Sequence, residues 1–257
     1  MSDVLTMEQN EQFQEDGFLL IRQHFSQEEM SGLLHYAKSD AQIQENAYSK
    51  NDGTGGKSKL SVNNELGPTP YSAIVQSRRV AGAMEQLLKD EIYHYHHKMM
   101  LKEPHVGGAW QWHQDYGYWY NNGCLFPDMA SCLIAIDQAS RENGCLQVIK
   151  GSHHMGRIDH GQTGDQTSAD LERVACAMER MELVHCEMMP GDALFFHANL
   201  LHRSDKNTSD MPRWSLICCY NTRHNDPYFT GGRHPNYAPL DILNDDQVRH
   251  TLIKLAS

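Results

Sequence analysis

The chain has 257 residues, enough to bury a full hydrophobic core, and its composition of 40% hydrophobic and 21% charged residues is typical of a globular protein. Its 22 Lys and Arg against 33 Asp and Glu give a net charge of −11, which disfavours nucleic acid as the main partner. No apolar run approaches the roughly 18 residues that a membrane span needs, so we expect no membrane partner.

The first 90 residues are predicted to be mainly helical. Two helix starts carry a capping residue, and apolar residues follow at helical spacing. In chain order we predict a helix from Thr6 through Phe13 that ends near Gly17, a strand over 18–22, a helix capped by Ser26 with Glu29, a polar surface loop over 45–70 and a helix over 73–90.

From residue 91 the sequence changes to short β segments separated by turn residues. The candidate strands are 91–101, 131–137, 145–149, 183–189, 193–197 and 214–220. Strands that follow helices in this way favour an α+β protein with a β-sandwich or jelly-roll core. The segment 152–182 has little β character and is predicted to cover one mouth of the barrel.

The chain shows no linker and no internal repeat, so we predict a single domain over 1–257. Its parts are a helical N-terminal part over 1–90, a jelly-roll core over 91–225 and a C-terminal tail over 226–257.

The seven cysteines indicate a reducing compartment. Their number is odd, and no Cys-x-x-Cys pair is present. Cys218 and Cys219 are adjacent in an apolar run, so on a strand they would point to opposite faces. The start of the chain also lacks a basic region followed by an apolar one, and we therefore expect a cytoplasmic protein with free thiols.

His113 and Asp115 form a first candidate metal site. Separated by one residue, they would lie on the same face of a strand, where an imidazole nitrogen and a carboxylate oxygen suit Fe(II), Mn or Zn. A second His from a distant strand would complete a two-His-one-carboxylate triad with three open positions. On its own, the pattern fits a pair of half-buried polar residues at a strand end better than a metal site.

The stretch 191–213 supplies the missing ligand and a cation. A predicted strand in this stretch places His197 or His202 as the second histidine, and Ser204 and Arg213 follow it. An oxygenase that uses 2-oxoglutarate needs a cation for the distal carboxylate of this cosubstrate. Arg suits that role because its guanidinium holds a carboxylate through two hydrogen bonds, and Ser204 could add a hydroxyl donor.

Together these motifs resemble the phytanoyl-CoA dioxygenase family of iron(II)- and 2-oxoglutarate-dependent oxygenases, which includes ectoine hydroxylase. The matching blocks are FQEDGFLLIRQHFSQEEM (13–30), WHQD (112–115), RENGCLQVIKGSH (141–153) and GDALFFHANLLHRSDKN (191–207), followed by Arg213. The resemblance thus extends from residue 13 to about 220. Lys150, where Pro is usual, and Arg203, where Gly is common, depart from the family pattern and bear on local loop geometry.

The resemblance implies a double-stranded β-helix, a jelly-roll or cupin-like core, with N-terminal helices packed on one sheet. It makes His113, Asp115 and His202 the iron(II) ligands and leaves His197 as a packed or neighbouring histidine. Arg213 and Ser204 would bind the distal carboxylate of 2-oxoglutarate, with Arg223 as a rival cation outside the matching block. Three further positions fall where relatives place side chains against the cosubstrate or substrate, namely Lys98, His96 and Leu133. For Lys98 and Leu133, an exposed strand lysine and a plain core leucine fit equally well.

The implied reaction is the oxidative decarboxylation of 2-oxoglutarate by O2 to succinate and CO2, coupled to hydroxylation of a substrate. Asp115 favours hydroxylation, because related halogenases have a small residue at that position. The residues that follow it form an aromatic run that suits a small zwitterionic or cationic metabolite through cation–π attraction. These candidates are Tyr116, Tyr118, Trp119, which matches a Trp of ectoine hydroxylase, and Tyr120. Any single Tyr fits packing at the barrel mouth equally well, and Arg157 could instead pair with an acidic substrate group.

Three alternatives stay open at this point. A cupin-like metal enzyme that does not use 2-oxoglutarate would have no use for Arg213. An acyl-CoA hydroxylase of the same family is disfavoured because the acidic chain shows no obvious basic patch for a polyanion. The third is a non-catalytic binding protein on the same fold. The sequence carries no signal for an oligomeric state.

Overall fold

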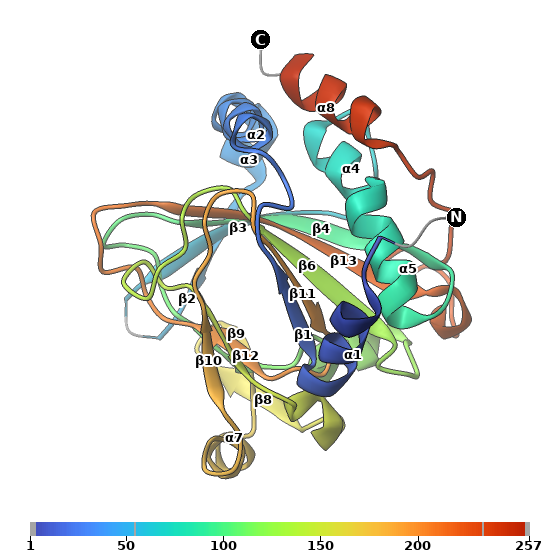
Figure 1. Ribbon diagram of the computed structural model, residues 1–257. Coiled ribbons are helices and arrows are strands. Elements are labelled where there is room, and N and C mark those ends of the chain that lie inside the picture. The colour runs from blue at the N-terminus through green and yellow to red at the C-terminus, as the bar shows by residue number, and fades with distance from the viewer. Residues whose placement is uncertain (1–3, 54, 233, 255–257) are drawn as a thin grey trace.

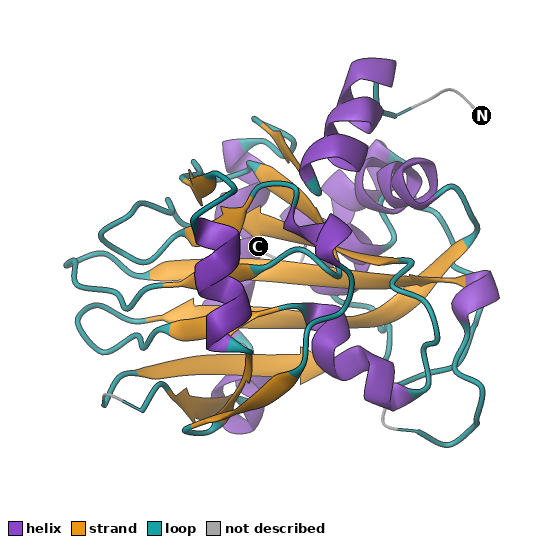
Figure 2. Ribbon diagram, turned by 90° about the horizontal axis from the view of Figure 1, so that it is seen from below, coloured by secondary structure: helices purple, strands orange, loops and turns teal. Residues whose placement is uncertain are grey.

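Two antiparallel β-sheets form the centre of the protein in this computed structural model, which describes residues 4–53, 55–232 and 234–254 (Figure 1). The larger sheet has the order β1 (Phe18–Ile21), β11 (Ala193–His197), β6 (Met129–Ala135), β13 (Arg213–Thr222), β4 (Ile92–Lys102), β3 (Lys57–Asn63) and β2 (Tyr48–Asn51). The smaller sheet has the order β10 (Leu183–Cys186), β7 (Leu146–Ile149), β12 (His202–Ser204) and β5 (Trp110–His113). In the view from below, the strands run side by side across the molecule and loops join them at both ends (Figure 2).

Alternation along β13 divides the hydrophobic core into two layers. Leu216, Cys218 and Tyr220 pack with the helices, whereas Ile217 and Cys219 face the space between the two sheets. The prediction that the adjacent cysteines point to opposite faces is therefore confirmed. The inner layer is the one in which the candidate site lies.

Helices cover the outer face of the larger sheet (Figure 1). They are α1 (Met7–Asp16), α2 (Gln27–Ser39), α3 (Ala41–Asn46), α4 (Pro70–Val75), the π-helix η1 (Arg78–Gly82), α5 (Ala83–Leu88) and α8 (Asp245–Lys254). The predicted caps are confirmed, since Thr6 and Ser26 each form a capping box, and α1 ends at Gly17 in a left-handed conformation with φ of 80°. Within the described ranges, no helix is both long enough and apolar enough to cross a bilayer.

The predicted surface loop over 45–70 was wrong, because much of this segment is a β-hairpin. Strands β2 and β3 pair with each other, and β3 pairs with β4, so the larger sheet begins well before residue 91. Exposed Lys57 and Lys59 alternate with buried Ser58 and Leu60. This two-residue period is weak, because only one of the two buried side chains is apolar.

The single helix predicted over 73–90 is also interrupted. The α4 helix ends at Val75, and the Ser77 hydroxyl then donates to the carbonyl of Ile74 and accepts from the N–H of Val80. Ser77 thereby caps η1, which leads into α5. A buried serine that hydrogen-bonds the backbone on both sides explains the break.

The predicted strands of the core are confirmed, with ends displaced by at most three residues. The segment 152–182, however, contains a two-stranded sheet of β8 (His160–Thr163) and β9 (Gln166–Ala169), followed by α7 (Leu171–Met178). This hairpin lies beside the edge strand β5, where the Gln166 side chain accepts from the N–H of Gln111 and donates to the carbonyl of Ala109. A side-chain amide thus takes the place of a neighbouring strand's backbone.

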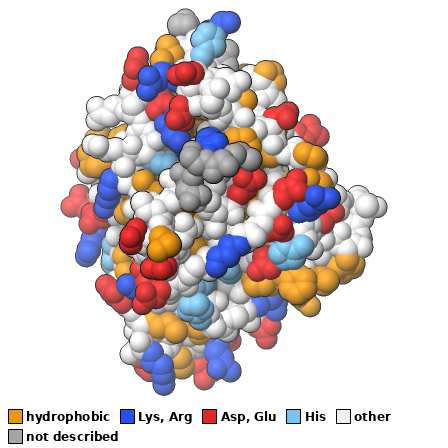
Figure 3. Space-filling view, turned by 45° about the vertical axis from the view of Figure 1, so that its right-hand side comes forward, with side chains coloured by type: hydrophobic (Ala, Val, Ile, Leu, Met, Phe, Trp, Pro, Cys, Tyr) orange, Lys and Arg blue, Asp and Glu red, His pale blue; other side chains and the backbone are white. Residues whose placement is uncertain are grey.

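The C-terminal region ends in a helix that packs back on the N-terminal helices. Val248 and Leu252 of α8 are fully buried. Arg79 lies between Asp245 of α8 and Glu29 of α2, with nitrogen–oxygen distances of 2.7 and 2.6 Å. On the face of the molecule shown in Figure 3, acidic and basic side chains are interspersed.

We predict that Ser26→Ala lowers the free energy of unfolding by about 1 kcal/mol, because the Glu29 N–H loses its acceptor. Urea denaturation followed by circular dichroism measures the change. Ser39→Ala, in the last turn of the same helix, is the matched control and should change stability by less than about 0.5 kcal/mol. Equal stability of S26A and the wild type would contradict the importance of this cap.

Candidate active site

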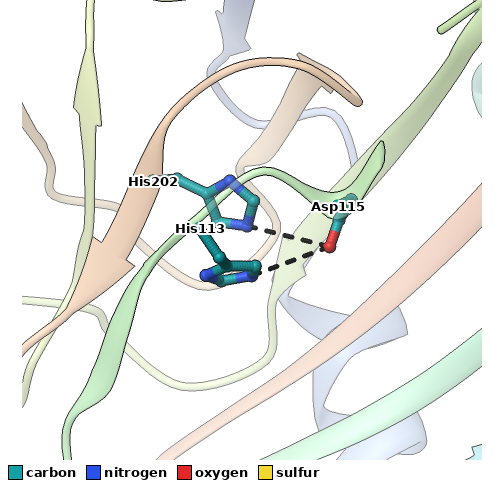
Figure 4. A group of neighbouring side chains, drawn as sticks. All are labelled: His113, Asp115 and His202. Carbon is teal, nitrogen blue, oxygen red and sulfur yellow. Dashed lines mark ion pairs between the residues drawn. The ribbon is translucent and has the colours of Figure 1, made fainter. Parts of the chain in front are cut away.

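Three buried side chains between the sheets form a compact group of metal-binding donors. His113 ends β5, His202 begins β12, and the two are directly opposite in the antiparallel pair. Asp115 is the first residue of a short helix, α6 (Asp115–Trp119). Its Oδ1 lies 3.7 Å from Nε2 of His113 and 4.0 Å from Nε2 of His202, and the donor atoms all lie within 4.8 Å of one another (Figure 4).

The expectation that one strand carries both His113 and Asp115 was wrong. The strand ends at His113, Gln114 remains extended, and the helix starts at Asp115, so the two side chains converge through a turn. Gln114 is fully buried, and its amide donates to the carbonyls of Gly156 and Asn199 while its oxygen accepts from the N–H of Ile158. Its side chain thus fixes the turn, a role that the sequence pattern did not reveal.

Hydrogen bonds to backbone carbonyls set the tautomers of both histidines. Nδ1 of His113 lies 2.8 Å from the carbonyl of Gln111, and Nδ1 of His202 lies 2.9 Å from that of Leu200. Because a carbonyl only accepts, each Nδ1 carries the proton and each Nε2 presents a lone pair toward Asp115. Burial also lowers the pKa of His202 to about 3, which keeps this ring neutral.

Asp115 is ionised despite its burial. Burial alone would raise its pKa, but the nearby charge of Lys98 holds the pKa well below its usual range. Two neutral imidazole nitrogens and one carboxylate oxygen are a donor set that fits Fe(II) with open coordination positions.

Two buried basic side chains lie near the same space. Arg213 and Lys102 are opposite each other on β13 and β4, so their side chains emerge on the same face of the sheet. The Lys102 ammonium donates to the hydroxyl of Ser204, 2.9 Å away, and to the carbonyl of Asp205. The Arg213 guanidinium donates to the carbonyl of Gly144, while its Nε has no acceptor among the residues that the structure describes.

Neither cation forms an ion pair with a carboxylate among residues 4–53, 55–232 and 234–254. Burial lowers the pKa of both groups, to about 10 for Arg213, which still leaves the guanidinium charged at neutral pH. Buried charges in proteins are normally paired, so this pair fits a ligand that brings its own carboxylate. The sequence analysis missed Lys102, although it lies four residues beyond Lys98 on the same face of β4.

One inner cavity brings together most of the predicted cofactor residues. The residues that line it include His113, Asp115, His202, Arg213, Ser204, Lys98 and Leu133, together with Trp110, Met100, Leu146, Phe196, Arg203 and Ile217. The metal-donor group and Arg213 therefore face one enclosed space.

A second, outer cavity adjoins the inner one and shares Lys98 and Trp110 with it. Tyr118 and Trp119 line this cavity. His96 does so as well, 5.6 Å from the ring of Trp119, so it lies with the aromatic wall and not beside Arg213. The other lining residues are Tyr48, Lys50, Leu60, Val62, Asn122, Asp165, Gln166, Thr167 and His234.

Three of the predicted substrate residues line neither cavity. The Tyr116 hydroxyl donates to the carbonyl of Cys124, and Tyr120 is 46% exposed. The Arg157 guanidinium lies over the ring of Tyr120, 4.8 Å from its centre, and donates to the carbonyl of Gly117.

The two rival residues of the sequence analysis also lie outside both cavities. Nδ1 of His197 accepts from the N–H of Asn199, and its ring lies 5.3 Å from that of His153. Arg223 is at the surface and pairs with Glu91.

Comparison with known proteins identifies the family. The phytanoyl-CoA dioxygenase (PhyH) family matches residues 13–215, which is most of the chain. The chain belongs to this family. The family that the sequence motifs predicted is thereby confirmed, and the protein is an iron(II)- and 2-oxoglutarate-dependent dioxygenase.

Two relatives of this PhyH protein are named as a hydroxylase and a dioxygenase. It is 32% identical over 190 residues to L-proline trans-4-hydroxylase of Streptomyces griseoviridis, a match that covers 67% of this chain and 68% of that protein. It is 25% identical over 240 residues to ectoine dioxygenase of Bordetella bronchiseptica, covering 87% and 78% of the two chains.

The fold of the PhyH chain also matches solved structures. The crystal structure of EctD from S. alaskensis with 2-oxoglutarate and 5-hydroxyectoine superimposes with a TM-score of 0.78 at 22% identity, over 95% of this chain and 89% of that one. The structure of the same protein with bound Fe gives a TM-score of 0.77 at 21% identity and the same coverage. The predicted jelly-roll fold with helices on one sheet is thus confirmed.

Mn(II), or Fe(II) without oxygen, should raise the melting temperature of the wild type. At a metal concentration of a hundred times the dissociation constant, binding adds about 2.7 kcal/mol to stability. Differential scanning calorimetry measures the shift. His202→Ala should remove the response, whereas His197→Ala, which changes a half-buried histidine outside the cavities, should retain it. A metal-induced shift in H202A as large as that of the wild type would rule out this ligand set.

Proposed function

We propose that the protein hydroxylates a small zwitterionic metabolite, using Fe(II), 2-oxoglutarate and O2 and releasing succinate and CO2. The observation that carries the proposal is a single inner cavity with the His113-Asp115-His202 group in its wall together with Arg213, which forms no ion pair within the described residues. A 2-oxoglutarate molecule has a keto acid for the metal at one end and a carboxylate for the cation at the other. A cupin-like enzyme without this cosubstrate, or a simple binding protein, would not need both groups.

Each group of residues then has a defined role. His113, Asp115 and His202 would hold the iron, which supplies the activation of O2, the oxidative decarboxylation of 2-oxoglutarate and the oxygen transfer to substrate. Arg213 and Ser204 would bind the distal carboxylate, and Lys102, which donates to the Ser204 hydroxyl from outside the cavity wall, would hold that hydroxyl in place. Leu133, Leu146, Phe196 and Ile217 make the remaining wall apolar and exclude water from the cosubstrate.

The outer cavity supports a zwitterionic substrate. The rings of Tyr118 and Trp119 offer faces that attract a cation, and Lys98 offers an ammonium to a carboxylate where the two cavities meet. His96 adds a neutral imidazole to the same wall, because burial lowers its pKa well below the usual value. The relatives named for proline and ectoine point the same way, because both compounds are small zwitterions.

An acyl-CoA substrate is less well supported. Its phosphates would need a basic surface beside the substrate entrance. The net charge of −11 disfavours such a surface. A cytoplasmic location is part of the proposal, and it is supported by the seven cysteines, all of which are free thiols.

Arg213→Ala should raise the KM for 2-oxoglutarate about tenfold or more, because hydrogen bonds to a charged group contribute about 1.5–3 kcal/mol. Succinate formation at varied cosubstrate concentration measures this constant. Arg223→Ala is the matched control, since its side chain pairs with Glu91 at the surface and should leave the KM unchanged. An unaltered KM in R213A would favour an enzyme that does not use 2-oxoglutarate.

The reaction itself is tested with a panel of compounds. Purified protein with Fe(II), ascorbate, O2 and 2-oxoglutarate should form succinate faster when a small amino acid, betaine, cyclic amidine or aminophosphonate is added. Mass spectrometry of the stimulating compound should show one added oxygen atom. Asp115→Ala is the inactive control. Stimulation by acyl-CoA compounds alone would overturn the substrate class, and the absence of succinate with every compound would overturn the reaction.

A further inference from the structure

We propose that Ser131 is a positioning residue: its hydroxyl, acting with that of Tyr118, holds the Asp115 carboxylate so that a single oxygen faces the metal position. The inference rests on the proposed iron site, and it concerns residues outside the ligand set.

The two oxygens of Asp115 have different surroundings. Oδ1 is the oxygen that faces both histidine Nε2 atoms, and it also accepts the Tyr118 hydroxyl at 2.7 Å. Oδ2 accepts the Ser131 hydroxyl at 3.2 Å. Each oxygen therefore has its own hydroxyl donor, and rotation of the carboxylate would break both hydrogen bonds.

Ser131 approaches the carboxylate from the sheet opposite the histidine ligands. It lies on β6, paired with Phe196 of β11 on one side and with Cys219 of β13 on the other, and it is fully buried. His113 and His202 belong to the smaller sheet. The carboxylate is thus fixed from one sheet while the two imidazoles are fixed from the other.

Cys219 orients the Ser131 hydroxyl. Its sulfur lies 3.3 Å from the serine oxygen, but a hydroxyl has one proton and a carboxylate is the stronger acceptor. The serine proton therefore goes to Asp115, and the thiol proton of Cys219 points to the serine oxygen. Burial raises the pKa of Cys219 to about 12, so the thiol keeps its proton. A buried chain of hydrogen bonds therefore runs from the Cys219 thiol through the Ser131 hydroxyl to the Asp115 carboxylate.

Tyr118 completes the arrangement from the side of the outer cavity. Its ring lies nearly parallel to that of His113, with 18° between the planes and 6.0 Å between the centres. The same ring lines the outer cavity. One residue thus contacts a metal-ligand oxygen and also forms part of the wall that the substrate would meet.

The consequence concerns how many metal positions stay open. Two histidines and a carboxylate leave three of six positions free only when the carboxylate binds through one oxygen. Without its bond to Ser131, Oδ2 is free to bind the metal as well and to take a position that 2-oxoglutarate or O2 requires. Groups that orient metal ligands typically change metal affinity or activity by about 10–100-fold.

The test compares Ser131→Ala with the wild type and two cysteine variants. S131A removes one oxygen atom and leaves the strand intact. Cys219→Ala removes the thiol that orients the serine, and Cys218→Ala is its matched control, because this neighbour faces the helix-covered layer. Mn(II) affinity is measured by the loss of the free-ion electron paramagnetic resonance signal, without any turnover. The anaerobic visible band with Fe(II) gives the 2-oxoglutarate concentration at half-saturation, and calorimetry gives the melting temperature.

We expect S131A to need about tenfold more 2-oxoglutarate for half-saturation, because Oδ2 takes a metal position that the cosubstrate needs, and to bind Mn(II) at least as tightly as the wild type. C219A should show a smaller rise in the half-saturation concentration, and C218A should match the wild type. An unchanged half-saturation concentration in S131A, with or without a fall in melting temperature, would overturn the proposal for Ser131. Failure of the wild type itself to bind Mn(II) would instead overturn the proposed iron site.

Discussion

The pairing of β12 with β5 is the contact on which the active site depends. It places His202 opposite His113, although 88 residues of chain lie between them by their numbering. Directly opposed residues of an antiparallel pair have their Cβ atoms about 5 Å apart, which is the separation that two imidazoles need to reach one ion. The rest of the jelly roll supports this pairing. Strand β7 pairs with β12 on its other side, and the larger sheet forms the opposite wall of the space that contains the two imidazole rings.

Charge is distributed unequally along that enclosed space. At one end the Asp115 carboxylate stays ionised beside two imidazoles, and at the other end the Arg213 guanidinium stays charged without an ion-pair partner from the described part of the chain. Moving charges out of water costs free energy unless they are paired. A metal cation would balance the negative charge of the carboxylate, and the distal carboxylate of the cosubstrate would balance the positive charge at the other end. The charges of the site are therefore balanced only when metal and cosubstrate are both bound.

The sequence predicted the metal-donor group and the double-stranded β-helix through motifs that resemble those of the family, since the His113 and Asp115 pattern alone did not favour a metal site. It was not sufficient to predict contacts between residues that come together only in the folded chain. Lys102 resembles any strand lysine until β4 pairs with β13 and places it opposite Arg213. Gln114 seemed a spacer between two ligands, but its side chain fixes the turn between strand and helix.

The β2–β3 hairpin was not predicted because the buried positions of its alternating pattern are a serine and a single leucine. Tyr116 and Tyr120 share a run with Tyr118 and Trp119, yet the helical path of α6 turns them away from the cavity.

The two cavities differ in the parts of the chain that build them. Strands of the two central sheets, together with Asp115, supply the wall of the inner cavity. The outer cavity takes much of its wall from the β2–β3 hairpin, the tip of the β8–β9 hairpin and the residues after Asp115. Hairpins and connecting segments tolerate replacement and insertion far better than central strands do. Proteins that evolve from this fold can therefore change the substrate by changes in these hairpins, while the metal and cosubstrate site in the central strands stays the same.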